Sequence, residues 1–373
     1  MQRIYLDANA TTPLDPRVRE AMLPWVDCGN ASSPHAEGRA ARAAIDRARE
    51  QVADLIGAQP REIVFTSGAT EANALALLGT LAARRCARVL TSAVEHPSVL
   101  RTLDAVRERV DVIVAPVRAD GCVPAGTTVP PDTGLVSIML ANNETGAIMP
   151  VKEIATHARA SGAVVHTDAV QACGKIPVDV EALAVDLLTL SAHKMHGPKG
   201  AGALYVRHGA RLAPLFVGGE HERGLRAGTE NVAAIVGLGA AAVRAVEEGA
   251  ARRELWSHLH ERCVAQLRAA FPDASIHTPE AMLPNTICLT FPDVEGEAVL
   301  LGLDLAGIAV ATGSACSSGA TEPSHVLQAM GLTRAEAERS IRISFHAQSC
   351  EADVAACVTT LSRVVKSLRA LHV

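Results

Sequence analysis

Short apolar runs alternate with helical patterns over the first two-thirds of this 373-residue chain, and few folds accommodate such an order. Helical patterns separate several of the runs, and residues 35–57 form an amphipathic helix pattern that Gly57 closes. The runs that have the length and the β-branched content of buried strands are 62–67, 87–92, 110–116, 134–140, 163–168, 186–192 and 202–207. The alternation predicts an α/β domain with a mostly parallel sheet flanked by helices.

The last third of the chain has a different order of helical and strand patterns. An alanine-rich helical stretch runs from about residue 231 to about 271. After it, strand patterns, a Gly/Ser loop and helical patterns follow one another as far as a final helix. We therefore expect a large α/β domain over residues 15–250 and a smaller α+β domain made of residues 1–14 and 251–373.

Composition excludes several classes of protein. The net charge is −5, the charges are interspersed, and aromatic residues make up only 2%, which argues against a nucleic-acid surface. Asp7 interrupts the apolar opening, and no apolar run is long enough to span a bilayer, so we expect a cytoplasmic protein without a signal peptide or membrane contact. The nine cysteines form no C-x-x-C pair, so a disulfide framework or a structural zinc site is not expected. Most of them, such as Cys288 in TICLTF, are expected to be buried apolar residues.

Lys194 follows an apolar strand pattern and precedes a glycine- and proline-rich turn, in SAHKMHGPKGAG. A lysine at a strand end among small residues suits a Schiff base with a bound ligand. The alternative is a solvated loop lysine, which is the better interpretation of a lone lysine. Ser191 and His193 can bond a phosphate and favour a ligand site. His193 and His196 also suggest a metal, but a pair without a third ligand is weak support for one.

Two further segments place ligand-binding groups where strand patterns end. Asp168 ends the strand pattern of AVVHTDAVQ, where a carboxylate can pair with a protonated ring nitrogen of a cofactor. Taken alone, a helix N-cap is the better interpretation of Asp168. In VFTSGATEAN the backbone N–H groups of residues 68–70 and the Thr70 hydroxyl open a helix and can bind phosphate. The alternative there is a tight turn that needs Gly68 only for its geometry.

Cys316 lies among glycine, serine, alanine and threonine in ATGSACSSGATEPSHVL, which predicts a flexible, exposed loop. A cysteine in such a loop can reach a substrate and then swing away, provided that its thiolate forms. The alternative is a chance surface cysteine, the commoner fate of a lone cysteine. Arg342 of SIRISF, a candidate carboxylate anchor in the same predicted domain, weakens that alternative.

Together these segments resemble the fold-type I pyridoxal phosphate (PLP) enzymes of the aminotransferase class V family, and specifically the cysteine desulfurases of the NifS/IscS group. Each motif alone is weak, but the ordered set is highly specific and covers nearly the whole chain. In chain order the matching motifs are YLDANATTPLDP, GNASSPHAEGR, FTSGATEAN, EHPSVL, NNETG, HTDAVQ, SAHKMHGPKG, RAGTEN, GSACSSG, EPSHVLQAMGL and SIRIS.

The resemblance implies PLP as cofactor and a role for each matching residue. Lys194 would carry the cofactor as a Schiff base, Asp168 would bind its pyridine nitrogen, and His96 would stack on its ring and take part in catalysis. The other implied contacts are Gln171 at the phenolic oxygen, Ala69, Thr70, Ser191, His193 and Thr229 of the partner subunit at the phosphate, and Asn143 and Arg342 at the substrate carboxylate.

The same resemblance implies a reaction and partners. Cys316 would attack the sulfur of cofactor-bound L-cysteine, leaving L-alanine and a Cys316 persulfide. An acceptor protein would then take the sulfur for iron–sulfur cluster or other thio-cofactor synthesis. The role of Thr229 implies an obligate homodimer, and the long SACSSG loop is similar to that of the NifS/IscS group rather than the SufS group.

The chain departs from the family pattern at three places. His346 follows the substrate arginine where a small residue is usual, Met149 stands where glutamine is usual, and the chain ends at Val373 without the tail by which housekeeping members dock their scaffold. Because of the missing tail, docking of that kind is not expected. Two other hypotheses stay open: an aminotransferase or selenocysteine lyase that does not need Cys316, and a non-catalytic sulfur-relay relative. The presence of Lys194, Asp168, His96 and Cys316 opposes the second.

Overall fold

The apolar runs of the first two-thirds form one seven-stranded sheet in the computed structural model, which describes residues 3–84, 86–312 and 322–371. Its strands are β2 (Ile63–Thr66), β3 (Arg88–Ser92), β4 (Asp111–Ala115), β5 (Thr133–Ser137), β6 (Val164–Asp168), β7 (Leu187–Ser191) and β8 (Gly202–Val206). In space they follow the order β2-β8-β7-β6-β5-β3-β4. Only β8 runs antiparallel to its neighbours within this sheet, so the predicted mostly parallel α/β fold is confirmed.

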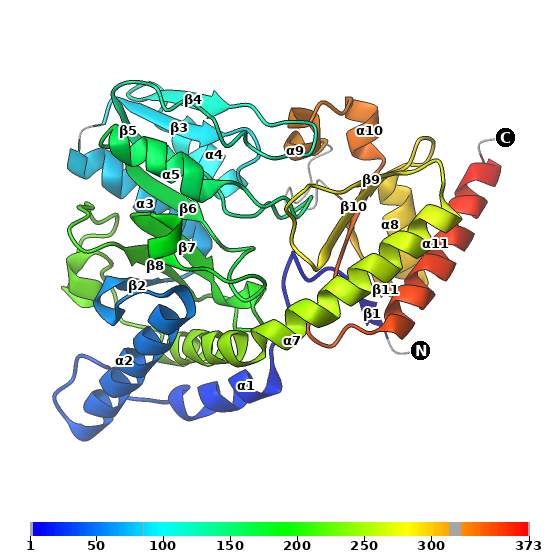
Figure 1. Cartoon of the computed structure of the whole chain (residues 1–373). Coiled ribbons are helices and arrows are strands. Elements are labelled where there is room, and N and C mark those ends of the chain that lie inside the picture. Colours follow the sequence, from blue (N-terminus) through cyan, green and yellow to red (C-terminus); the bar gives the residue numbers. More distant parts are fainter. Residues whose placement is uncertain (1–2, 85, 313–321, 372–373) are drawn as a thin grey trace.

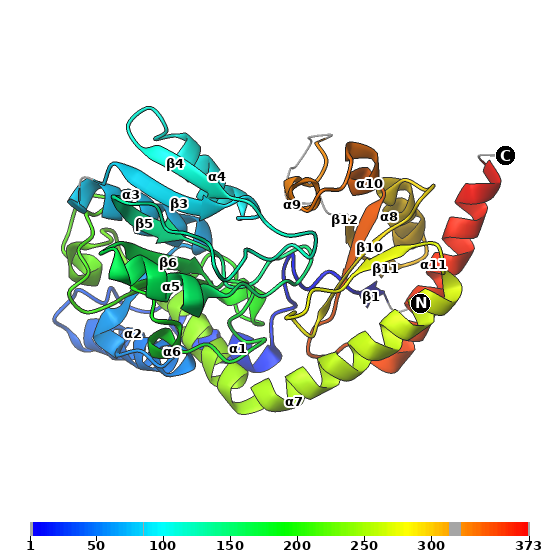
Figure 2. The same cartoon turned by 45° about the horizontal axis from the view of Figure 1, so that its top comes forward.

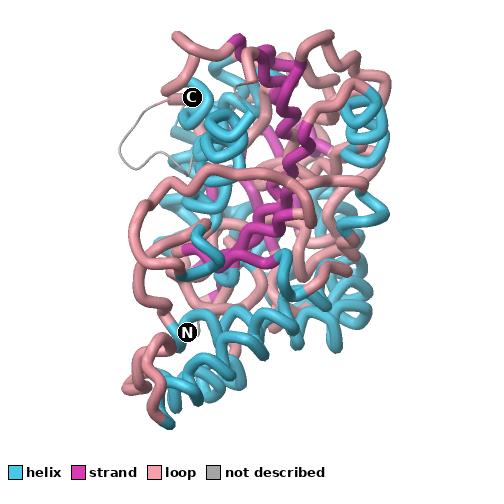
Figure 3. The backbone as a smooth tube through the Cα atoms, turned by 90° about the vertical axis from the view of Figure 1, so that its left-hand side faces the viewer, coloured by secondary structure: helices cyan, strands magenta, loops and turns pink. Residues whose placement is uncertain are grey.

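Helices cover both faces of this sheet, and Figure 3 shows the strands in the middle with helices on either side. One core lies between the sheet and α2 (Ala36–Ile56), α5 (Val151–Ala160) and α7 (Val232–Ala270). A second core, on the other face, contains Leu75 of α3 (Ala69–Arg84) and Val99 of α4 (Pro97–Asp104). Both β6 and β7 are buried at every position, which is typical of central strands in a sheet covered on both faces.

Small residues replace aromatic ones in these cores. The predicted amphipathic helix is α2, which Gly57 ends in the left-handed conformation at φ 67°. Along its buried face α2 packs on α7, where a Cβ added at Gly239 would meet Ala48 Cα at 2.7 Å. Two helices approach so closely only when glycine and alanine form the contact, which explains how a chain with 2% aromatic residues still fills its interior.

The C-terminal third forms a second, smaller group of elements, on the right of Figure 1. The first residues of the chain belong to it, because β1 pairs in parallel with β11. An antiparallel sheet has the order β12-β13-β10-β9. The elements of this group are β1 (Ile4–Tyr5), β9 (Ser275–His277), β10 (Thr286–Thr290), α8 (Gly296–Leu305), β11 (Ile308–Ala309), β12 (Ala311–Thr312), α9 (His325–Ala329), α10 (Arg334–Glu338), β13 (Ser340–Ser344) and α11 (Glu351–Leu371).

The long helix α7 joins the two groups and runs along the lower edge of the molecule in Figure 2. It has 39 residues, and the Asn231 side chain caps its first turn by accepting from the backbone N–H of Ala234. Leu238 lies in the core under the large sheet, whereas Leu259 lies in the core of the C-terminal group together with Leu6. The helix thus crosses the predicted boundary at residue 250 without a break, and that boundary stays a prediction. No helix in the described ranges, α7 included, is both long and apolar enough to cross a membrane.

Short helices complete the described part of the chain, and one of them places a site residue. The short helices are α1 (Pro16–Met22), α6 (Val180–Leu183), η1 (Leu23–Trp25), η2 (Pro60–Glu62), η3 (Ala192–Lys194) and η4 (His221–Gly224). Of these, η3 directly follows β7 and ends on Lys194, so the lysine lies at the carboxyl end of a central strand, as predicted.

Candidate active site

A cavity of about 620 Å³ opens at the carboxyl ends of the parallel strands, between the large sheet and the C-terminal group. Asp168 ends β6 and Ser191 ends β7, and both line the cavity. Arg342 reaches it from β13, more than 140 residues further along the chain. The predicted site residues that line this single cavity are Ala69, Thr70, His96, Asn143, Asp168, Gln171, Ser191, His193, Lys194 and Arg342.

Two predicted residues are not among those that line the cavity. Cys316 lies outside the described residues. Thr229 of the same chain lines a smaller adjoining cavity of about 150 Å³, together with Ser67 and Gly200. Ser67 and Gly200 also line the large cavity, so these two residues separate Thr229 from the predicted phosphate end.

Asp168 has its carboxylate oriented by two donors. Oδ1 accepts from the backbone N–H of Val170 at 3.0 Å, and Oδ2 accepts from Asn73 Nδ2 at 2.7 Å. Asp168 caps no helix among the described elements, so the N-cap interpretation is not supported. A buried carboxylate held from behind in this way presents a fixed negative charge to the cavity.

The Lys194 amine lies against the N-terminal segment of the chain. Its Nζ donates to the carbonyl oxygens of Asn9, at 2.5 Å, and Ala10, at 2.9 Å. Lys194 is half-buried, and its amine is held at the wall of the cavity. The interpretation of a solvated loop lysine is therefore not supported.

Asn9 is a site residue that the sequence interpretation missed. Its carbonyl oxygen accepts from both Lys194 Nζ and Gln171 Nε2, and its Oδ1 accepts from Lys175 Nζ at 2.8 Å. Its Nδ2 donates to Asn143 O at 3.0 Å and to Thr286 Oγ1 at 2.9 Å. The motif YLDANATTP contained Asn9, but no local pattern could connect it to a lysine 185 residues away.

Lys175 is a second residue that was not predicted. Its amine is buried and donates to Asn9 Oδ1 and to Gln171 Oε1, both of them neutral amide oxygens. Burial holds the pKa of Lys175 well below its ordinary value, and the charges of Lys194 and Arg342 act in the same direction. Since Lys175 holds the oxygen end of the Gln171 amide, the NH₂ end faces Asn9 and the cavity.

Arg342 has its charge partly paired already. Nη2 donates to Asp7 Oδ1 at 2.7 Å, and Nη1 donates to Asn143 O at 2.9 Å. The side chain of Arg342 is 3% exposed, and its Nε has no hydrogen-bond partner among the described residues. A buried guanidinium with unused donor capacity at a cavity wall is suited to a carboxylate ligand.

The predicted phosphate end lies where β2 passes into α3. The carboxylate of Glu71 accepts from the backbone N–H of Ser67 at 2.8 Å and from Arg226 Nε at 2.9 Å, which fixes the turn before Ala69 and Thr70. His193 also lines the cavity. Burial lowers its pKa to about 4, and Lys194 and Lys199 add to the effect, so His193 is neutral near pH 7.

In the part of the chain that the structure describes, the histidines do not form a metal site, and the two unusual residues His346 and Met149 lie outside the cavity lining. Within the described residues no group of three or more His, Cys, Asp or Glu could hold a metal ion. His193 Nδ1 bonds Thr11 Oγ1 and His196 Nδ1 bonds Pro13 O, so the two histidines have different partners. The His346 ring lies 6.0 Å from that of Tyr5, and Met149 is buried. Neither His346 nor Met149 is among the residues that line the cavity.

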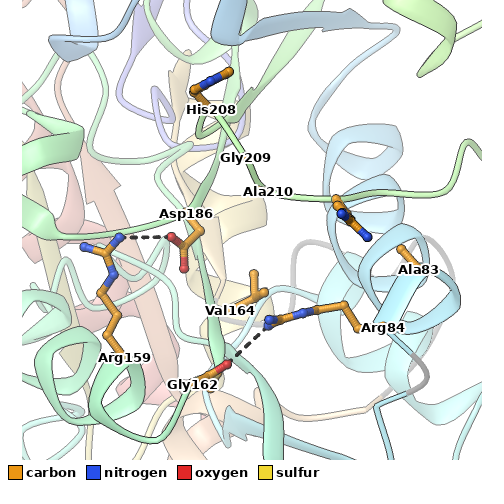
Figure 4. Close-up of a pocket in the computed structure, with 11 residues that line it drawn as sticks. Ala83, Arg84, Arg159, Gly162, Val164, Asp186, His208, Gly209 and Ala210 are labelled. Carbon is orange, nitrogen blue, oxygen red and sulfur yellow. Dashed lines mark hydrogen bonds and ion pairs between the residues drawn. The ribbon is translucent and has the colours of Figure 1, made fainter.

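A second large cavity, of about 640 Å³, lies at the opposite edge of the sheet and is drawn in Figure 4. Arg159 Nη2 there bonds Asp186 Oδ1 at 3.3 Å, and Arg84 Nη1 donates to Gly162 O at 3.2 Å. None of the predicted site residues lines it. The two cavities are of similar size. Parallel sheets bind ligands at the carboxyl ends of their strands, where Asp168, Lys194 and Arg342 meet in the first cavity.

Comparisons with known proteins identify the family of the chain. The model of the aminotransferase class-V family matches residues 4–357. A cysteine desulfurase of Cereibacter sphaeroides is 45% identical over all of this chain and 98% of its own length, and one of Trichormus azollae is 44% identical over all of this chain and 95% of its own.

The solved structure of a NifS-like protein superposes with a TM-score of 0.92 at 38% identity, covering 98% of this chain and 100% of that one. A structure of SspA in complex with cysteine gives 0.80 at 35% identity, with 92% and 98% covered. This chain therefore belongs to the aminotransferase class V family, in the group of the NifS-like cysteine desulfurases.

Proposed function

We propose that this protein is a PLP-dependent cysteine desulfurase, which removes the sulfur of L-cysteine and leaves L-alanine. The observation that carries the proposal is the meeting, in one cavity, of an amine, a buried carboxylate and a buried guanidinium from distant parts of the chain: Lys194, Asp168 and Arg342. The curated relatives are cysteine desulfurases, and SspA, a structural neighbour, was solved with cysteine bound.

The residues of the cavity fit PLP. Asp168 offers a carboxylate for the pyridine nitrogen, and Lys194 offers the amine for the aldehyde carbon. The start of α3 with Thr70, together with Ser191 and His193, offers donors for the phosphate. Gln171 offers its NH₂ end for the phenolic oxygen. Bound there, PLP supplies an electron sink for the negative charge that forms at the substrate Cα.

The side chains around the cofactor site divide the remaining tasks. Arg342 binds the substrate carboxylate, with Asn143 beside it, and this fixes the direction of the Cα–H bond. We assign to the Lys194 amine the movement of the proton at Cα. The neutral form of the amine is the one that can take this proton.

Cys316 is proposed to take the sulfur. Its thiolate attacks the sulfur of the bound cysteine, an S–S bond forms, and the C–S bond of the substrate breaks. The electron pair of the broken bond stays with the carbon, which takes a proton and becomes the methyl group of alanine. Overall, cysteine and the Cys316 thiol give alanine and the Cys316 persulfide, so neither an external oxidant nor a reductant is consumed. An acceptor thiol then takes the outer sulfur, and we propose an acceptor protein of sulfur-cofactor synthesis.

The Cys316→Ala variant tests the proposal, with Cys350→Ala, at an exposed cysteine, as the matched control. We expect the Cys316 variant to lose alanine and sulfide formation from L-cysteine by about 100-fold or more, while it keeps the visible absorbance of the cofactor. Lys194→Ala should lose both the activity and the visible absorbance of the cofactor. Full desulfurase activity in Cys316→Ala would contradict the proposed sulfur transfer, and a keto acid product in place of alanine would favour an aminotransferase.

A further inference from the structure

A chain of hydrogen bonds connects Asp168 to His96 through two residues to which no role has been assigned. Asn73 Nδ2 donates to Asp168 Oδ2 at 2.7 Å and to Ser98 Oγ at 2.9 Å. Ser98 Oγ in turn lies 2.8 Å from His96 Nδ1. Asn73 is 0% exposed and Ser98 is 9% exposed, so water does not compete for these bonds.

The direction of each bond follows from groups that can only donate or only accept. The backbone N–H of Ser98 points at His96 Nδ1, at 3.1 Å, and an N–H cannot accept. His96 Nδ1 therefore carries a lone pair. The Asp168 carboxylate only accepts, which assigns the NH₂ end of Asn73 to it and, with the second hydrogen, to Ser98 Oγ.

The Ser98 hydroxyl can donate one hydrogen bond of its own. Its oxygen already receives the hydrogen from Asn73, and His96 Nδ1 is its acceptor among the described residues. With two donors directed at Nδ1, the single ring proton of neutral His96 lies on Nε2. Since His96 lines the large cavity, Nε2 is the ring nitrogen left to face a ligand.

We propose that Ser98 and Asn73 are positioning residues that hold His96 as the neutral imidazole with its proton on Nε2, and that Asn73 couples this state to the Asp168 carboxylate. The inference rests on the proposed function only for its catalytic consequence. His96 then presents an N–H donor, rather than a cation or a lone pair, to the cofactor and substrate.

The charged groups around His96 come from three other elements. Burial is the largest influence and lowers the pKa of His96; Lys194 of η3 and His325 of α9 act in the same direction, and Asp168 of β6 opposes them. His325 is itself tied to the carbonyl oxygen of Glu95, at 2.9 Å. The Ser98 hydroxyl acts with burial, because only the neutral ring can accept its hydrogen.

His96 also caps α4 through the Ser98 backbone N–H, and a purely structural role would end there. The Ser98→Ala variant separates the two roles, since it keeps the backbone N–H and removes only the hydroxyl. Ser98→Thr restores a hydroxyl at the same place. Thr102→Val is the matched control, because the Thr102 hydroxyl lies in the same helix and bonds the Ser98 carbonyl oxygen rather than His96.

The experiment is ring-nitrogen NMR of the full-length protein labelled with ¹⁵N-histidine, before and after PLP is added, with His96→Gln to assign the signals. In the parent we expect an unprotonated Nδ1 and a protonated Nε2 near neutral pH. In Ser98→Ala the titration midpoint of His96 should rise by about 0.5 to 1 pH unit, the value of one hydrogen bond. Ser98→Thr and Thr102→Val should both titrate like the parent.

The Asn73→Leu variant is an independent test. It removes the donor that orients the Ser98 hydroxyl, so the titration midpoint of His96 should rise in this variant as well. A proton on Nδ1 in the parent, or unchanged midpoints in both Ser98→Ala and Asn73→Leu, would overturn the inference. In the holoenzyme the acid limb of kcat/KM should move with the midpoint. Because the NMR result needs no turnover, it stands or fails separately from the desulfurase proposal.

Discussion

Arg342 is held by partners before any substrate binds. It donates through Nη1 to Asn143 O and through Nη2 to Asp7 Oδ1, and both contacts depend on the planar fork of the guanidinium. A lysine can make one of these bonds but cannot also offer two parallel donors to a carboxylate. We predict that Arg342→Lys raises KM for L-cysteine by about 10- to 100-fold, with a smaller effect on kcat, in steady-state assays of alanine formation.

The matched control for this change is Arg339→Lys. Arg339 precedes the same strand but pairs with Glu295 at the surface, so its replacement should leave KM within about twofold of the parent. If Arg342→Lys kept the parent KM, the carboxylate of the substrate would have to bind elsewhere in the cavity.

Glu144 has an unusual environment for an acid. Burial raises its pKa to about 7, against the hydrogen bond from Ser324 Oγ and the charge of Arg342. An unfolded glutamate has a pKa of about 4.3, so between these two pH values the folded protein binds a proton that the unfolded chain does not. The stability that this proton contributes is fully present below about pH 4.3 and is lost as pH rises through about 7.

Glu144→Gln removes this ionisation and keeps a neutral acceptor for Ser324. We predict that the free energy of unfolding of the variant, relative to the parent, rises by about 2 kcal/mol between pH 5 and pH 8. Urea unfolding at several pH values measures the difference. Glu50→Gln, at an exposed position of α2, should show no such trend. A difference independent of pH in Glu144→Gln would mean that Glu144 is ionised in the folded protein throughout this range.

At the scale of elements, the turn at the predicted phosphate end depends on the strand beside it. Gly202 of β8 pairs with Thr66 of β2 and Ser191 of β7. A Cβ there would lie 2.7 Å from Gly68 C and 3.0 Å from Leu190 O, distances at which the backbone must move. We predict that Gly202→Ala displaces the turn and weakens PLP binding by about tenfold, measured by titrating the cofactor-free protein and following absorbance.

Gly126→Ala is the control, because a Cβ at Gly126 meets nothing within 4 Å. It should bind PLP like the parent. Thermal unfolding of both cofactor-free proteins separates a local effect on the turn from general destabilisation. Equal PLP affinity in Gly202→Ala and Gly126→Ala would rule out the turn as a determinant of cofactor binding.

Elements and their order could be predicted from the sequence because hydrophobic periodicity reports which residues face the core. The seven strands of the large sheet, α2 with its Gly57 cap and the long α7 all follow from that pattern. Hydrogen bonds between polar groups far apart in the chain do not follow from hydrophobic periodicity. The bond from Lys194 to Asn9, the burial of Lys175 and the contact of Asn73 with Asp168 depend on tertiary packing, and no local spacing encodes them.

At the scale of the whole molecule, the N-terminal segment holds the two groups of elements together at the cavity. Asn9 accepts from Lys194 on the large-sheet side and donates to Thr286 of β10 on the other. Asp7 likewise pairs with Arg342 of β13. A site assembled from both groups keeps its geometry only if they stay in register, and α7, which has residues in both cores, provides a continuous connection between them.

The homodimer that the family resemblance implies raises the question of which chain supplies Thr229. Within one chain Thr229 lines the small cavity beside Ser67 and Gly200, so action in its own subunit is a real alternative to action in the partner's site. A mixed dimer of Lys194→Ala and Thr229→Ala subunits, isolated with two different tags, decides between them. If Thr229 acts across the interface, one site of the mixed dimer carries both defects and the other carries none, by the symmetry of a two-fold dimer. We predict that such dimers regain about half of the parent desulfurase activity, while each variant homodimer stays defective. If Thr229 acts within its own chain, every site keeps one defect, and mixing restores nothing.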